Sequence, residues 1–186
     1  MISVLPKKGH LLIAEPTNLG DNSFNRSVIL LAEHNKEGSV GFILNKPLRY
    51  KICDLIPDIK IPFKIYNGGP VEQDNVYFIH NVPNQIPGSI EIADGIFWGG
   101  DFETAKNLIN EEKISKKNIR FFLGYSGWDK KQLDRELKEN SWIIIQNELK
   151  SKVLSKSTQD FWKEKIIEQG GDYVLYSNAP EDPNLN

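Results

Sequence analysis

The residues best suited to bind a polar or charged partner lie at the ends of one apolar segment and in a glycine turn that follows it. Residues 26–47, RSVILLAEHNKEGSVGFILNKP, contain two aliphatic runs joined by a polar turn. Guanidinium, ammonium and amide groups donate hydrogen bonds to anionic or carbonyl oxygens, and adjacent glycine amides can do the same. We therefore predict a candidate binding surface made of Arg26, His34, Asn45, Lys46, Gly68 and Gly69.

Some of these candidates should meet in the fold. Residues 28–32 and 40–44 predict two strands, and NKEG at 35–38 predicts a hairpin turn between them. The start of the first strand and the end of the second lie at the same end of a hairpin. Arg26 should therefore lie beside Asn45 and Lys46, either as a shared site or as bonds that close the fold.

A second interpretation is a small hydrolase-like enzyme that uses Ser126 or His34. The segment IRFFLGYSGW predicts a strand, a tight turn and then a helix, the setting in which an exposed serine nucleophile occurs. The pattern G-x-S-x-G is not met, because Trp128 replaces its last glycine. We therefore favour a helix-capping role for Ser126, with the helix over residues 128–140.

His34 follows Glu33, so the pair could form a general base with an orienting carboxylate. Adjacent residues of a regular strand point to opposite faces, so this pair should not share one site. The three histidines lack the close spacing of a helical metal motif, and Cys53 is the single cysteine. We predict no metal, no cofactor and no intrachain disulfide.

A third interpretation is a nucleic-acid-associated regulator that acts through the basic stretch Lys113–Arg120. Phe121 and Phe122 follow that stretch, and nucleic acid favours basic patches near aromatic rings. A solvated turn before a buried strand explains the same residues. No helix-turn-helix, zinc-finger or RNA-recognition signature accompanies them, and the net charge of −2 gives no general attraction to phosphates.

Length and composition favour one cytoplasmic domain over residues 1–186, with loose termini at 1–8 and 178–186. No apolar run reaches the roughly 20 residues that span a bilayer. The strand patterns, together with helices after Asp101, over 128–140 and around Trp162, predict an α+β fold with a largely antiparallel or mixed sheet. Residues 173–176 are expected to form a last short strand.

Five blocks of the sequence match a known family in order: GHLLIAEP, FNRSVILLAEHNKEGSVGFILNKPL, YNGGPV followed by FIH, FLGYSGW, and QLDRELKENSW. They span most of residues 9–142, and by them the chain resembles the YqgE/AlgH family of bacterial proteins. Asp129-Lys130-Lys131 departs from the small residues that the family often has there. The resemblance implies an α+β fold with a curled, barrel-like mixed sheet and about three packed helices. It also implies a proposed transcriptional-regulator role without an established activity.

The favoured function is a non-catalytic cytoplasmic interaction or regulatory protein, because no complete catalytic or metal constellation is present in the sequence. Its partner is expected to be a protein or a small molecule, with nucleic acid as the less supported choice and no membrane. The hydrolase and nucleic-acid interpretations remain the alternatives.

Overall fold

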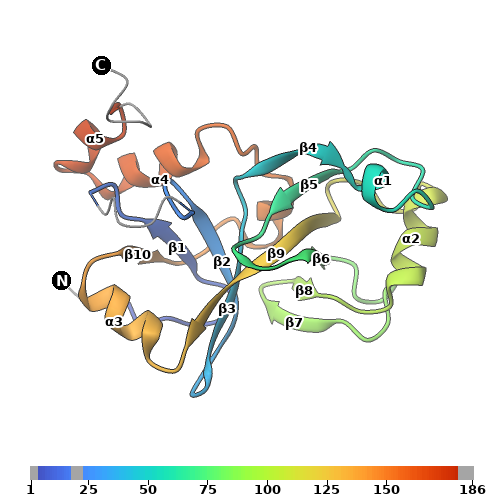
Figure 1. Cartoon of the computed structure of the whole chain (residues 1–186), viewed down its shortest axis with the longest axis horizontal. Helices are drawn as coiled ribbons and strands as arrows, with labels where there is room; N and C mark the ends of the chain where they lie inside the picture. The colour runs from blue at the N-terminus through green and yellow to red at the C-terminus, as the bar shows by residue number, and fades with distance from the viewer. Residues whose placement is uncertain (1–3, 18–22, 180–186) are drawn as a thin grey trace.

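One long central strand, β9 (Ile119–Asp129), joins the two halves of the molecule (Figure 1). The computed structural model describes residues 4–17 and 23–179. β9 is antiparallel to β3 (Gly38–Ile43) and to β6 (Val71–His80), and it is parallel to β5 (Lys64–Asn67). The strand is buried over most of its length because it has neighbours on both edges.

The strands form one open sheet with the order β10-β1-β2-β3-β9-β6-β8-β7, and the pair β4–β5 joins at β9. All strand pairs are antiparallel except β5 with β9. The remaining strands are β1 (Leu11–Ala14), β2 (Val28–Asn35), β4 (Pro47–Lys51), β7 (Ile90–Ala93), β8 (Ile96–Trp98) and β10 (Trp142–Ile145).

Helices cover both halves of the sheet. α3 (Gln132–Lys138), α4 (Phe161–Gln169) and α5 (Tyr173–Tyr176) lie on the half with β1, β2 and β10, whereas α1 (Ile52–Leu55) and α2 (Phe102–Asn110) lie on the other (Figure 1). A 3-10 helix, η1 (Lys150–Ser155), contributes buried Val153 and Leu154 to the largest core cluster. No helix in the described ranges is long and apolar enough to cross a membrane.

The α+β class and the predominantly antiparallel sheet are confirmed, but two expectations for the architecture are wrong. The sheet is open and does not close into a barrel, because β10 and β7 end the strand order without pairing to each other. The described residues hold five α-helices and one 3-10 helix instead of about three helices. The loose termini predicted at 1–8 and 178–186 lie partly outside the described residues.

Three local predictions are also wrong. Residues 173–176 form α5, because no neighbouring strand is available to pair with them. β4 begins at Pro47, where a strand end was expected; it lies at the margin of the sheet, where a proline costs no ladder bond. FLGYSGW does not turn: β9 continues to Asp129, and α3 begins only at Gln132.

Candidate binding site

The two ends of the β2–β3 hairpin have different surroundings. At the open end, the side chain of Asn45 joins the entry and the exit of the hairpin. Its Oδ1 accepts a hydrogen bond from the Val28 amide at 2.8 Å, and its Nδ2 donates to the Arg26 carbonyl at 2.8 Å. Asn45 therefore replaces the strand bonds that would close this end, and it places the two segments side by side.

Arg26 lies next to that closure, with its guanidinium carbon 5.0 Å from the centre of the Trp162 ring on α4. Its backbone has φ +54°, a left-handed conformation that is uncommon for residues other than glycine. Trp162 is held in turn by a 2.8 Å hydrogen bond from its indole Nε1 to the Ala14 carbonyl. The packing against a fixed indole gives the Arg26 side chain a defined position.

Lys46 completes this region and donates from Nζ to the Ser23 carbonyl at 2.8 Å. Around these residues lies a hollow of ≈ 620 Å³, which we call the signature pocket. It is lined by Asn25, Arg26, Asn45, Lys46, Pro47 and residues 158–163. The lining has three cationic side chains, Arg26, Lys46 and Lys163, against one carboxylate, Asp160.

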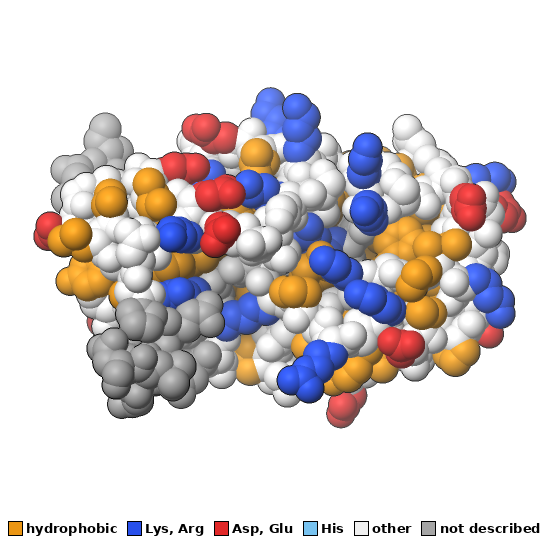
Figure 2. All heavy atoms as spheres, turned by 90° about the horizontal axis from the view of Figure 1, so that it is seen from above, with side chains coloured by type: hydrophobic (Ala, Val, Ile, Leu, Met, Phe, Trp, Pro, Cys, Tyr) orange, Lys and Arg blue, Asp and Glu red, His pale blue; other side chains and the backbone are white. Residues whose placement is uncertain are grey.

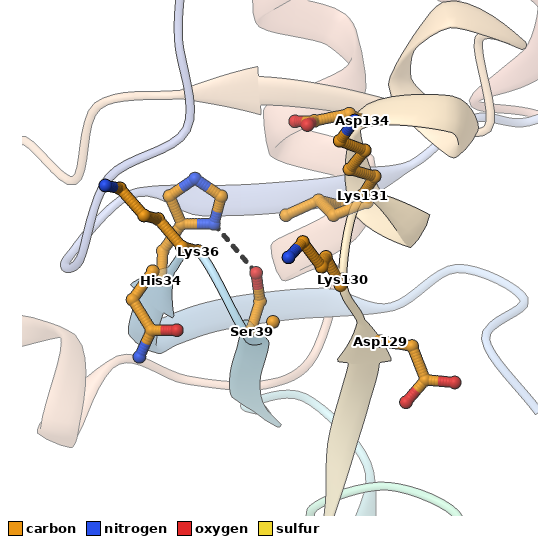
Figure 3. A pocket seen from close by; sticks show the side chains of 10 residues that line it. His34, Lys36, Ser39, Asp129, Lys130, Lys131 and Asp134 are labelled. Carbon is orange, nitrogen blue, oxygen red and sulfur yellow. Dashed lines mark hydrogen bonds between the residues drawn. The ribbon is translucent and has the colours of Figure 1, made fainter.

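His34 lies at the opposite, turn end of the hairpin and does not join the signature pocket. Its Nδ1 lies 2.7 Å from the Ser39 hydroxyl, in a second hollow of ≈ 530 Å³ that Lys130 and Lys131 also line (Figure 3). The Glu33 carboxylate accepts from the Asn35 amide instead. Glu33 and His34 therefore form no acid–base couple, as strand alternation predicts.

Gly68 and Gly69 also lie apart from the signature pocket, because both are buried between strands. A Cβ atom on Gly68 would lie 2.2 Å from the Gly124 carbonyl oxygen, so only glycine allows this approach to β9. The Gly68 carbonyl accepts from the Ser126 hydroxyl at 3.0 Å and from the Ile43 amide at 3.0 Å. This pair of glycines links β3, β5 and β9.

Ser126 is fully buried within β9, and its hydroxyl donates to Gly68. It neither caps a helix nor stands in a strained turn, so both sequence interpretations of its local structure are wrong. Gly124, two residues before Ser126, allows close backbone approach: a Cβ on it would lie 2.6 Å from the Val71 carbonyl oxygen. The position offers no exposed nucleophile.

The basic stretch Lys113–Arg120 divides into three environments. Lys113 pairs with Glu111 at 2.6 Å. Arg120 is 4% exposed, and it donates to the carbonyls of Leu44 and Lys156 at 2.9 Å each. Lys116 and Lys117 are exposed and line a hollow of ≈ 990 Å³.

We call this hollow the basic groove. Its lining comes from residues 51, 61–64, 66, 109, 112, 114–117, 119–120 and 154–159, and its cationic side chains are Lys51, Lys64, Lys116, Lys117, Arg120 and Lys156. Lysine and arginine side chains gather across the middle of this face (Figure 2). The basic groove and the signature pocket share Thr158 and Gln159, so the two hollows are contiguous.

A family model described as AlgH-like matches residues 11–174, which contain the hairpin, the signature pocket and the basic groove. This chain belongs to the AlgH-like family. The resemblance carried by the five sequence blocks is thereby confirmed.

The AlgH-like relatives match over nearly their whole length. The UPF0301 protein of Chlorobium limicola is 43% identical over 183 residues, which are 97% of this chain and 96% of that protein. A Bacteroides thetaiotaomicron relative is 40% identical over 188 residues, with coverage of 99% and 93%. The family is thus shown by sequence as well as by fold.

Two solved structures share the fold. A Corynebacterium diphtheriae protein has a TM-score of 0.75 at 25% identity, with 96% of this chain and 95% of that chain covered. The AlgH protein of Pseudomonas aeruginosa has a TM-score of 0.72 at 24% identity, with coverage of 97% and 98%. The arrangement of strands and helices that forms the two hollows is therefore common to these proteins as a fold.

Sequence reasoning missed most of the basic groove, because Lys51, Lys64 and Lys156 come from separate segments with no shared motif. It also missed the buried histidine of the other half. His80 donates from Nε2 to the Gly99 carbonyl at 3.0 Å, and its Nδ1 accepts from the Val82 amide at 3.2 Å. Burial lowers the pKa of His80, so the neutral ring is favoured. In the described part of this AlgH-like chain, no three His, Cys, Asp or Glu residues could hold a metal ion.

Proposed function

We propose that this protein is a non-catalytic interaction protein of the cytoplasm, which binds an acidic segment of a partner protein at the signature pocket. The observation that carries the proposal is the Arg26 guanidinium held 5.0 Å above the Trp162 ring, at the wall of an open polar hollow. Arginine and tryptophan are enriched among the residues that dominate binding energy at protein interfaces.

The charge of the pocket favours a carboxylate-bearing partner. Arg26, Lys46 and Lys163 outnumber Asp160 in its lining, and a planar guanidinium matches the geometry of a carboxylate. Asn25, Thr158 and Gln159 add side chains that can both donate and accept. A peptide with Asp or Glu residues could pair its carboxylates with the cationic side chains and its backbone with the uncharged polar ones.

The position of Arg26 further supports recognition. Its ring contact with Trp162 restricts the side chain before a partner arrives, which lowers the entropy that binding must overcome. If the protein is a regulator, the signature pocket favours regulation through a bound partner protein.

Capture on an affinity resin, followed by the affinity of the identified partner, tests this function. Arg26→Ala and Lys46→Ala should each weaken that affinity about tenfold or more, because each removes a charged donor. Lys130→Ala, at the other end of the hairpin, is the matched control and should change nothing. An affinity that survives both pocket substitutions contradicts the proposal.

A second candidate rests on one contact. The 2.7 Å separation of His34 Nδ1 from the Ser39 hydroxyl, in an open hollow, is compatible with a serine activated by a base (Figure 3). Ser39 is only 6% exposed, which weighs against it. Hydrolysis of generic esters that disappears in both His34→Ala and Ser39→Ala would favour this candidate; activity indifferent to both would end it.

A further inference from the structure

The basic groove contains lysines that form no ion pair with the described carboxylates. Lys51, Lys64, Lys116 and Lys117 line it, and among the described residues none of the four ammonium groups has a carboxylate partner within ion-pair distance. Lys156 pairs with Glu164 at 2.5 Å. Glu112 is the single acidic side chain in the lining. The groove therefore has an excess of cations at close range, which attracts multiply charged anions.

Arg120 strengthens that charge from below. Its side chain is almost fully buried and lies 4.6 Å from the centre of the Tyr66 ring. Its guanidinium donates to the backbone carbonyls of Leu44 and Lys156, and no carboxylate of the described residues faces it. Burial lowers its pKa, yet a guanidinium stays protonated in proteins. The two carbonyls accept hydrogen bonds from the Arg120 guanidinium but do not cancel its positive charge. A bound anion would stabilise this buried charge.

The groove also offers an apolar floor and hydroxyl groups. Tyr66 comes from β5, Ile61 and Phe63 come from the residues just before β5, and Leu154 comes from η1. Ser115, Ser155, Ser157 and Thr158 add hydroxyls to the rim. A volume of ≈ 990 Å³ lies at the upper end of the range for small-molecule sites, roughly 300–1,000 Å³. An inorganic ion would leave most of that volume and the whole floor unused.

We propose that the basic groove binds an organic phosphate of nucleotide size, with its phosphates among Lys64, Lys116 and Lys117 and its apolar part against the floor. Two sources present this chemistry, a free nucleotide and the nucleotides of a single strand. This proposal does not depend on the proposed binding of a partner protein, because Arg26 and Lys46 do not line the basic groove.

Titration calorimetry with ATP at about 20 mM salt tests the proposal, because low ionic strength leaves the lysine charges unscreened. The double variant Lys116→Ala/Lys117→Ala should weaken ATP binding about tenfold or more. The matched control is Lys130→Ala/Lys131→Ala, which also removes two consecutive exposed lysines but at the hairpin-turn end. It should leave ATP affinity unchanged. Equal loss in both double variants, or no binding of ATP and of the oligonucleotide below, overturns the proposal.

Two further ligands define the occupant. Inorganic triphosphate should bind more weakly than ATP, because it cannot use the apolar floor; equal affinity would contradict the organic part of the proposal. A short oligothymidylate that binds more tightly than ATP, with steep loss at higher salt, and that is weakened by Lys116→Ala/Lys117→Ala identifies the single strand as the source. Folding of each variant is checked by its urea midpoint.

Discussion

The signature pocket and the basic groove share an edge but use their polar groups in opposite ways. In the signature pocket, Asn45 binds both chain segments of the hairpin, and Lys46 and Arg26 donate to the carbonyls of Ser23 and Ala179. In the basic groove, Lys64, Lys116 and Lys117 have no carboxylate partner among the described residues. Polar side chains of the signature pocket thus also hold the fold together. The three groove lysines make no ion pair with the described residues, so their charge can attract the proposed ligand.

This difference shows why a dense sequence motif and a binding site need not coincide. Residues that meet at a hairpin end are close in sequence and easily noticed, and part of their role is structural. Charges that meet in the groove come from four segments that only the folded sheet brings together. The comparison predicts large stability effects at the signature pocket and small ones among the groove lysines.

Asn45→Ala should show the largest loss of stability. It removes two hydrogen bonds and leaves the buried Val28 amide and the Arg26 carbonyl without their partner. An unsatisfied buried group costs about 1–3 kcal/mol, so we expect the free energy of unfolding to fall by about 3 kcal/mol. Urea denaturation measures it. A loss under about 0.5 kcal/mol would show that Asn45 does not close the hairpin.

Arg120→Leu should rank second, and it tests the buried cation of the groove. The substitution removes hydrogen bonds to the Leu44 and Lys156 carbonyls, but it also removes a buried charge that lacks a carboxylate partner. These effects oppose each other, so we expect a net loss of about 2 kcal/mol. Unchanged stability together with unchanged ATP affinity would show that Arg120 neither stabilises the fold nor contributes to ligand binding.

The pH dependence of stability should come from outside both regions. Burial lowers the pKa of His80 in the folded protein below its unfolded value, so the unfolded chain binds the extra proton more readily. Stability should therefore fall as pH drops below about 6.5, by at most about 1.4 kcal/mol per pH unit for one proton. His80→Gln should flatten that slope in urea denaturation. Burial and Lys7 also lower the pKa of His10, which would leave a residual slope.

Lys116→Ala/Lys117→Ala should have the smallest effect on stability. Both side chains are exposed and no ion pair is lost, so the free energy of unfolding should change by less than about 0.5 kcal/mol. At low salt a small gain is expected, because repulsion within the groove is relieved. A loss above about 1 kcal/mol would mean that these lysines have a structural role, as Asn45 does.

Much of the fold could be predicted from the sequence. The aliphatic runs around 28–32 and 40–44 lie within or beside strands β2 and β3, and Asp101 caps α2 by accepting from the Thr104 amide at 2.8 Å. The predictions failed where tertiary contacts override local pattern. Gly124 and Gly127 suggested a turn beside Ser126, but both lie within strand β9, where Gly124 allows close packing against β6.

The candidate site was predicted only in part, for the same reason. The predicted hairpin placed Arg26 beside Asn45 and Lys46, and in the structure the three residues line the same pocket. His34 was included on residue type, yet it lies at the opposite end of strand β2 from Arg26, in a different hollow from the signature pocket. The basic groove forms where β5, η1 and the start of β9 come together in the fold. No local sequence pattern predicts that these segments are neighbours.

An NMR titration of isotope-labelled protein with ATP tests the central claim most directly, because it locates the ligand on both regions at once. The account predicts saturable shifts of backbone signals from residues 61–66, 115–120 and 154–158, with small changes at Arg26 and Asn45. Shifts centred on Arg26, Asn45 and Lys46, with an unaffected groove, would contradict the division of roles between the signature pocket and the basic groove.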